Sequence, residues 1–142
     1  MNISPAGLNL LKTCEGYRSH TYLDVAGLST IGYGHLLVGE TFPYGITESH
    51  ATALLSADLG WAEHAVTSLV TVPVTQGQFD ALCDFTYNLG ANALKTSTLL
   101  KLLNLGQYDA AGQELLKWNR AAGHVVAGLT TRRQAELGIW NG

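Results

Sequence analysis

The sequence predicts an α+β protein in which a β-rich segment near the N-terminus is set into an otherwise helical chain. Residues 17–45 are rich in glycine and tyrosine, whereas the segments around them repeat apolar residues at helical spacing. The 142 residues are 46% apolar and only 13% charged, which is enough for a sizeable core. We therefore expect one domain over residues 1–142, without internal repeats.

The first element is expected to be a helix. Ser4 is a good N-cap and Pro5 suits the first helical position, where its missing N–H costs nothing. Apolar residues then recur at helical spacing as far as Cys14, and Gly16 is expected to end the helix. Glu15 thus stands at the end of an apolar helix.

The next segment is expected to form short strands and tight turns, in a β-rich lobe of about residues 16–46. Tyr22, Ile31 and Tyr33 are good strand formers. Five glycines interrupt the run and mark turns; they are Gly27, Gly32, Gly34, Gly39 and Gly45.

The remainder is expected to be a helical lobe, residues 70–142 together with the N-terminal helix, reached through a long helix from Thr47 to Leu69. Thr47 is its expected N-cap and Gly60 its weak point. Thr75 and Gln78 have the spacing of a capping box. The later helices are expected at residues 75–90, at 97–106, in the stretch YDAAGQELLKW, and from about Thr130 to Ile139.

Charge and composition narrow the possible functions. The net charge of −3 divides into −6 for residues 1–90 and +3 for residues 91–142. The basic part suits either an anionic surface such as a cell-wall polymer or a solvated face, and it lacks the dense basic stripe that nucleic acid requires. No apolar run approaches the ~20 residues that span a bilayer. The N-terminal residues do not resemble a secretory signal, so we expect synthesis and folding in a cytoplasm.

The cysteines and histidines suggest no other chemistry. Cys14 and Cys83 are too few for a disulfide framework, and two buried thiols are expected. Cys14 as a nucleophile is the alternative, but no cation is placed to lower the pKa of its thiol. The five histidines have no metal-binding spacing, so neither metal nor cofactor is expected.

Two carboxylates in the β-rich region carry the functional hypothesis. Partial burial of Glu15 among apolar, glycine and tyrosine residues would raise the pKa of its carboxyl and suit a general acid. Asp24 lies nine residues later in a turn-prone segment, where an Asp most often accepts main-chain hydrogen bonds. A protonated and an ionised carboxyl on opposite sides of a groove can cleave a glycosidic bond, and Thr30 could help to hold the water.

The spacing of Glu15, Asp24 and Thr30 resembles the active site of the phage-type lysozymes of glycoside hydrolase family 24. The words EGYR, TYLD, STIGYGH, FDALCDFTYNLG, STLLKLLN and GLTTRRQAE also resemble that family and extend to about residue 136. The resemblance implies a two-lobed lysozyme fold with a substrate groove between the lobes. It implies an endolysin, a bacteriolytic hydrolase of the lambdoid-phage type that cuts the β-1,4 bond between N-acetylmuramic acid and N-acetylglucosamine in peptidoglycan, with inversion.

The resemblance also implies supporting residues, each with an alternative. His35 matches a histidine behind the acid, or is structural. Arg132 matches an arginine that can pair with the catalytic Glu, with Arg133 as its rival. Asn88 either binds a sugar N-acetyl group or ends its helix, and Tyr33 either stacks on a sugar or packs in the hairpin.

Two other functions compete with hydrolysis. A lytic transglycosylase would use a similar Glu but needs no activated water, and a silent wall-binding module would need no triad. The expected partner is the glycan strand of peptidoglycan, with no nucleic acid, and the chain is expected to act as a monomer. The resemblance further implies that it waits in the host cytoplasm and reaches the periplasm and cell wall through a separately encoded holin.

Overall fold

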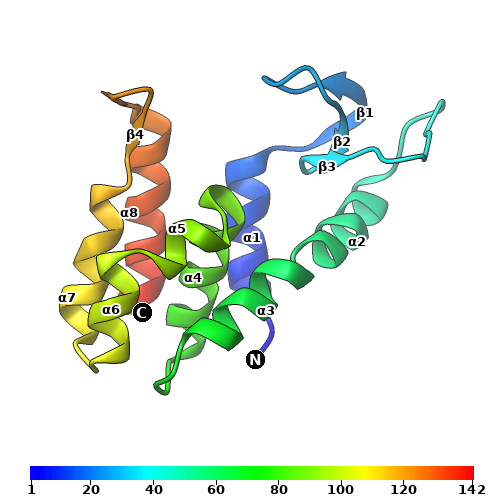
Figure 1. The fold of residues 1–142 in the computed structure, drawn as a ribbon. Helices are drawn as coiled ribbons and strands as arrows, with labels where there is room; N and C mark the ends of the chain where they lie inside the picture. The colour runs from blue at the N-terminus through cyan, green and yellow to red at the C-terminus, as the bar shows by residue number, and fades with distance from the viewer. The chain divides into compact units, whose positions relative to one another are not determined.

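The computed structural model describes residues 1–142 and divides them into two compact units. The β-rich unit is Leu11–Gly60, and the helical unit combines Met1–Leu10 with Trp61–Gly142. None of the helices has the length and apolar character needed to cross a membrane. Figure 1 traces the elements. In chain order they are α1 (Pro5–Glu15), β1 (Arg18–Leu23), β2 (Ser29–Gly32), β3 (His35–Leu36), α2 (Glu48–Asp58), α3 (Gly60–Leu69), α4 (Gln76–Leu89), α5 (Ala91–Lys95), α6 (Thr98–Asn104), α7 (Tyr108–Glu114), the 3-10 helix η1 (Leu115–Lys117), β4 (Arg120–Ala121), β5 (His124–Val125) and α8 (Ala127–Asn141).

The β-rich unit contains a three-stranded antiparallel sheet in the order β1-β2-β3. Tyr22 pairs with Thr30 and Leu23 with Ser29, and the register shifts between Arg18 and Tyr22. Because paired residues share a face and neighbours along a strand alternate, Tyr22 and Thr30 lie on one face and Ser29 on the other. The expectation of short strands and tight turns in this segment is confirmed.

The helix expected from Thr47 to Leu69 forms as two helices. The Thr47 hydroxyl accepts a hydrogen bond from the His50 N–H and caps α2, as expected. Residue Leu59 separates α2 from α3, which begins at Gly60. Glycine is about 1 kcal/mol less favourable than alanine inside a helix, which explains an interruption at this position.

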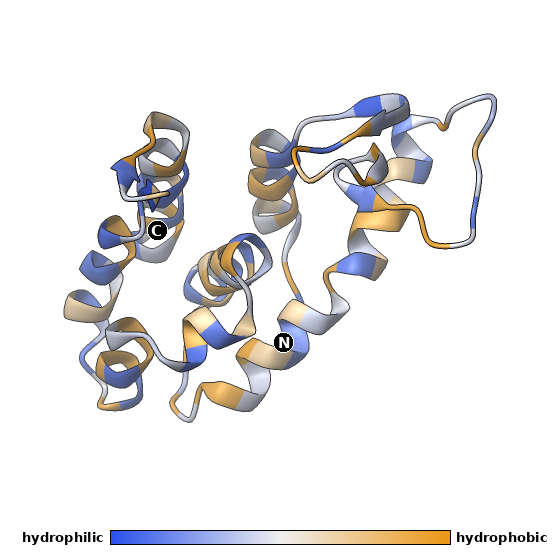
Figure 2. Cartoon of the chain, turned by 45° about the horizontal axis from the view of Figure 1, so that its top comes forward, coloured by the Kyte–Doolittle hydropathy of each residue, from blue (hydrophilic) through white to orange (hydrophobic).

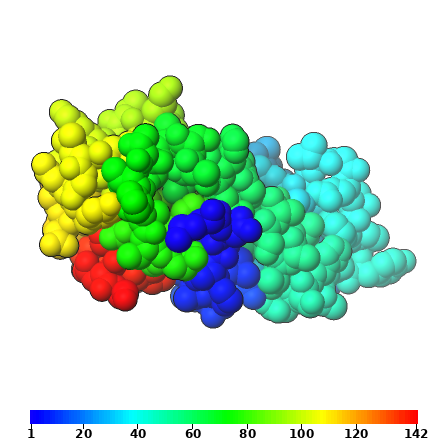
Figure 3. Space-filling view, turned by 90° about the horizontal axis from the view of Figure 1, so that it is seen from below, coloured from blue at the N-terminus to red at the C-terminus, as the bar shows by residue number.

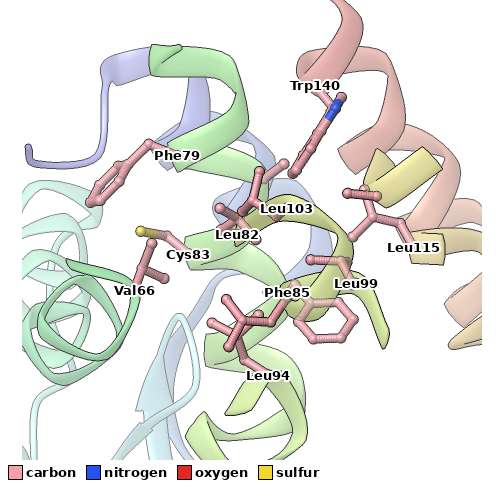
Figure 4. Close-up of a cluster of buried hydrophobic side chains, with 13 residues drawn as sticks. Val66, Phe79, Leu82, Cys83, Phe85, Leu94, Leu99, Leu103, Leu115 and Trp140 are labelled. Carbon is pink, nitrogen blue, oxygen red and sulfur yellow. The ribbon is translucent and has the colours of Figure 1, made fainter. Parts of the chain in front are cut away.

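The hydrophobic core of the helical unit is built around α4. Figure 4 shows side chains of α3, α4, α5, α6, η1 and α8 meeting there, among them Phe79, Leu82 and Phe85 from α4. The Phe85 ring meets Trp118 edge-on at 5.3 Å between centroids. These helices carry hydrophobic and hydrophilic residues together, as the mixed colours of their ribbons show (Figure 2), so each can bury one side.

Local capping sets the ends of these helices. The Thr75 and Gln78 side chains form the expected capping box at the start of α4. The Ser4 N–H donates to the Asp80 carboxylate at 2.9 Å, and the Gln76 side chain donates to the Asn2 carbonyl at 2.9 Å. The first residues of the chain therefore lie against the beginning of α4 (Figure 3).

Three features of the helical unit differ from the expectation. The last helix begins at Ala127 and ends at Asn141, so it is longer at both ends than the predicted segment. The five-residue helix α5 and the hairpin of β4 and β5 were not predicted. Both are too short for apolar periodicity to reveal, since each covers fewer residues than a periodic pattern needs.

Candidate functional site

The β-rich unit brings the end of α1 close to the turn between β2 and β3. Glu15 is the last residue of α1 and is partly buried. A Cβ atom added to Gly34 would lie 3.3 Å from Glu15 Oε2, so the absence of a side chain at Gly34 lets the turn approach this carboxylate. Gly34 has a φ of +76°, which glycine adopts without strain.

Asp24 is held by the turn that joins β1 to β2. Its Oδ1 accepts hydrogen bonds from the N–H groups of Ala26 and Leu28, each at 2.9 Å. This is the turn role that an Asp in this position was expected to have. Its Oδ2 accepts no hydrogen bond from the protein and is therefore available to a ligand or a water.

Thr30 is buried in β2, with 2% of its surface exposed. Its hydroxyl donates to the Leu28 carbonyl at 2.8 Å, and the Asp24 N–H donates to the same carbonyl at 2.9 Å. Because the hydroxyl proton is used in this bond, the Thr30 oxygen can act only as an acceptor toward a third group. The main chain of Leu28 thus orients both Asp24 and Thr30.

His35 bridges two carboxylates within the β-rich unit. Its Nδ1 lies 2.7 Å from an Asp58 oxygen at the end of α2, and its Nε2 lies 2.5 Å from Glu40. Burial alone would lower the pKa of the imidazole, but the two carboxylates outweigh burial and raise it above the usual value. These contacts fit a structural histidine, and a supporting role of His35 behind the acid stays a prediction.

Tyr33 is packed, with 7% of its surface exposed. Its ring lies 5.6 Å from that of Tyr17, and its hydroxyl donates to Glu48 at 2.7 Å. Burial, together with the Glu48 carboxylate, raises the pKa of the Tyr33 phenol to about 12. These contacts favour packing over stacking on a sugar.

The other two expected residues, Arg132 and Asn88, belong to a polar cluster of the helical unit in which Arg132 is buried and Asn88 is partly buried. Arg132 forms two hydrogen bonds with Asp84, from Nε at 2.9 Å and from a terminal nitrogen at 2.8 Å. Arg133 donates at 2.8 Å both to the Asn88 side chain and to Glu136. The pairing of Arg132 with Glu15 stays a prediction.

The titration of this cluster is strongly perturbed. Burial opposes ionisation of Asp84, yet its polar neighbours and the two arginines bring the pKa of this carboxyl below its usual value. Burial and the nearby Asp84 raise the pKa of Glu136 well above the usual range. The pKa values of the two neighbouring carboxyls are therefore displaced in opposite directions.

Sequence reasoning missed the partners of these residues. Asp84 gave a usable signal, because a carboxylate on the apolar helix FDALCDFTYNL requires a buried partner. Asp58 and Glu40 gave no such signal, since they lie 23 and 5 positions from His35 and neither spacing is a local motif.

No group of three His, Cys, Asp or Glu side chains is arranged to hold a metal ion.

The model of one protein family, described as phage lysozyme, matches residues 12–136. This match covers most of the chain and includes Glu15, Asp24 and Thr30. The chain belongs to the phage lysozyme family.

Two relatives of this phage lysozyme are named endolysin. The one from Bacillus phage B103 is 46% identical over 138 residues, which are 96% of this chain and 52% of the relative. The one from Acyrthosiphon pisum secondary endosymbiont phage 1 is 40% identical and covers 99% of this chain and 98% of the relative. The chain thus spans about half of the first relative and nearly all of the second.

Solved structures show the same fold. A mutant of P22 lysozyme superposes with a TM-score of 0.91 at 37% identity, covering 100% of this chain and 99% of that one. The muramidase domain of SpmX from Asticaccaulis excentricus gives 0.90 at 36% identity, covering 99% and 98%. The expected lysozyme-like α+β fold is confirmed.

Proposed function

We propose that this phage lysozyme is an endolysin that hydrolyses the β-1,4 bond between N-acetylmuramic acid and N-acetylglucosamine in peptidoglycan. Membership of the family supports a glycoside hydrolase. Relatives from the two phages named above are called endolysins, and a structural neighbour is called a muramidase domain.

The observation that carries the proposal is the shared anchoring of Asp24 and Thr30 by Leu28. Asp24 Oδ2 is the oxygen that takes a proton from the attacking water, and the Thr30 oxygen accepts the second hydrogen of that water. Glu15 donates its proton to the leaving oxygen of the glycosidic bond. Because both acceptors are fixed by the main chain of Leu28, the water is oriented before the substrate arrives, which lowers the entropy cost of attack.

We further propose that the reaction inverts the anomeric carbon, because the water is held by two residues and no nucleophile replaces it. Inversion requires the two carboxyls to be about 6.5–9.5 Å apart, so that a water fits between the Asp and the sugar. Proton NMR of the first product formed should show the α-anomer. A β-anomer as the first product would contradict inversion.

Replacing Glu15 with Gln tests the function. The amide has nearly the same shape but cannot donate the proton, so hydrolysis should fall by roughly 10²–10⁴-fold while the fold is kept. The readout is clearing of outer-membrane-permeabilised cells, with circular dichroism as the check of folding. Glu114→Gln is the matched control, since Glu114 pairs with exposed Lys117 at 2.9 Å in the helical unit. A Glu15→Gln protein with half of the wild-type activity would remove Glu15 as the acid.

The products distinguish hydrolysis from transglycosylation. Hydrolysis leaves a reducing N-acetylmuramic acid end, whereas a transglycosylase leaves a 1,6-anhydro end. Mass spectrometry of digested cell wall should show the reducing end, which is heavier by one water.

We propose that the chain acts as a monomer and crosses the host inner membrane through a separately encoded holin, remaining in the cytoplasm until then. The resemblance to phage endolysins supports this order of events. Expression of this chain alone should leave cells intact until the membrane is permeabilised, for example by chloroform. Lysis without permeabilisation would contradict the proposal.

A further inference from the structure

A pocket of about 320 Å³ lies in the β-rich unit, away from Thr30. Thr21 and Ser29 line it from the sheet. Ser29 neighbours Thr30 in β2 and so lies on the opposite face of the sheet, and Thr21 lines the same pocket as Ser29. The pocket is therefore separate from the side of the sheet that carries the proposed water-binding residue.

Three hydroxyl groups in this pocket are available to a ligand. Thr21, Ser29 and Thr41 line the pocket, and their side chains make no hydrogen bond within the protein. Elsewhere in the chain hydroxyls are mostly used locally, as when Thr52 and Thr67 donate to main-chain carbonyls of their own helices. Each hydroxyl in the pocket can therefore donate one hydrogen bond and accept others.

The segment that follows β3 supplies the rest of the wall. Phe42 and Pro43 offer apolar surface. The Phe42 ring is held edge-on against His50, with centroids 5.4 Å apart. Glu40 also lines the pocket, and its position is fixed by the 2.5 Å contact with His35. The wall is thus held in place before any ligand binds.

The residues that line the pocket indicate which class of ligand it can bind. A purely apolar ligand would leave the three hydroxyls without partners, which costs free energy. An anion would meet the carboxylate of Glu40 and no Lys or Arg, and a metal ion would find only that one carboxylate. A neutral pyranose satisfies both kinds of surface, because its C–H face packs on an aromatic ring and its hydroxyls bond to Thr and Ser.

We propose that this pocket binds one N-acetylhexosamine residue of the peptidoglycan glycan, as a second sugar site apart from the site of hydrolysis. This rests on the proposed function, which makes that glycan the polymer the enzyme meets. A second binding site raises the effective concentration of the enzyme on an insoluble polymer without changing the chemical step. Short soluble fragments cannot engage both sites and gain nothing from it.

Binding to the cell wall tests the pocket. The variant Thr21→Val with Ser29→Ala removes two hydroxyls and keeps a β-branched residue in β1. Both changes are placed in a Glu15→Gln chain to prevent digestion, and the bound fraction is measured by pelleting with purified sacculi. The dissociation constant should rise about five- to tenfold, as expected for losing one or two hydrogen bonds. Ser49→Ala with Ser56→Ala, on the exposed surface of α2, is the matched control and should bind as the parent does.

Activity separates this proposal from the proposed function. In the chain with intact Glu15, the double variant should cleave soluble glycan fragments at the wild-type rate and clear insoluble wall more slowly. If the wild-type protein cleaves neither the soluble fragments nor the insoluble wall, the proposed function itself is wrong. Unchanged pelleting, or an equal loss in the control, would overturn the second sugar site.

Two further measurements guard against an effect of folding. If the double variant melts at a lower temperature, Thr41→Val, at the exposed edge of the pocket, replaces it in the same assays. In addition, N-acetylglucosamine titrated into ¹⁵N-labelled protein should shift the amide signals of residues 40–42, and Thr41→Val should weaken this shift. Absence of any shift in this segment would overturn the proposal.

Discussion

At the scale of single residues, the main chain of Leu28 forms hydrogen bonds with both Asp24 and Thr30. It donates to Asp24 and accepts from Thr30, so one residue with an exposed apolar side chain orients two polar ones. The sequence pointed to Asp24 and Thr30 because their spacing from Glu15 resembles that of the phage-type lysozymes. It could not show that Thr30 is left as an acceptor, because this depends on where its proton is bonded.

Replacing Thr30 with Val tests this acceptor. Valine keeps the shape and the strand preference but loses the oxygen. We expect hydrolysis to fall by roughly 10²-fold, because the attacking water loses one of the two acceptors that orient it. Stability should fall by about 1 kcal/mol, because the hydrogen bond to Leu28 is lost.

The control for this change is Thr67→Val in the helical unit. Thr67 donates to a main-chain carbonyl at 2.8 Å, so its loss imitates the structural part of the Thr30 change. It should cost similar stability and no activity. Wild-type hydrolysis by the Thr30→Val protein would show that Thr30 only closes the turn, and would reopen the transglycosylase alternative.

His35 makes the stability of the β-rich unit dependent on pH. Its pKa in the folded chain is raised above the ~6.5 of an unfolded histidine. Protonated His35 therefore contributes stability that is fully present below about pH 6.5 and is lost as pH rises through the folded-state pKa. Thermal unfolding followed between pH 5.5 and 9 should show the melting temperature falling over this upper range.

The His35→Gln variant should lose this dependence and keep the remaining pH profile. His64→Gln is the control, because His64 is exposed on α3 and lies in the other unit. If the pH dependence of the melting temperature persisted in His35→Gln and disappeared in His64→Gln, His35 would not be its source.

At the scale of helices and strands, the sequence predicted most where the signal is local. The capping box of Thr75 and Gln78 and the N-cap Thr47 were read from spacing alone, because these bonds join residues three apart. The start of α8 was missed, since Val126 precedes it without a capping side chain. The β4–β5 hairpin was missed because its strands are short. Its turn also places Ala122 at a φ of +51°, a conformation that residues other than glycine rarely adopt.

The contact between α4 and α8 gives a prediction at this scale. A Cβ atom added to Gly77 in α4 would lie 2.2 Å from the Ile139 carbonyl oxygen in α8, a distance that the main chain must relieve by moving. We expect Gly77→Ala to destabilise the protein by about 1–3 kcal/mol, as overpacked sites do. Chemical denaturation measures the change.

Gly138→Ala is the matched control within α8. A Cβ atom there meets nothing within 4 Å, so alanine should stabilise the helix by roughly 0.5–1 kcal/mol. The two substitutions are chemically identical and opposite in expected sign. Equal effects would show that helix propensity, and not the approach of α8, decides the outcome at Gly77.

At the scale of the whole chain, the sequence predicted the fold class and missed the pairings that join distant residues. Arg132 and Asp84 are 48 residues apart and form a buried bidentate pair. Removing one partner from such a pair leaves an uncompensated charge, so the pairing matters to stability although no local motif reveals it. The family resemblance predicted that Arg132 can pair with the catalytic Glu15. The apolar periodicity of the sequence predicted no partner for Arg132.

The two cysteines report on the two units of the molecule, because Cys14 belongs to the β-rich unit and Cys83 to the helical unit. Neither is in a disulfide. Cys83 is fully buried, and burial raises the pKa of its thiol far above the usual range, so it offers no reactive thiolate in the folded protein. Cys14 is only partly buried. We expect a thiol reagent to label Cys14 first under native conditions.

Labelling as a function of denaturant then follows the unfolding of each unit. If the chain unfolds in one cooperative step, Cys83 should become reactive at the same midpoint at which circular dichroism is lost. Single-cysteine variants, Cys14→Ser and Cys83→Ala, identify which thiol reacts. Rapid labelling of Cys83 in the absence of denaturant would contradict its burial. Protection of Cys83 beyond the loss of the β-rich unit would show that the helical unit unfolds separately.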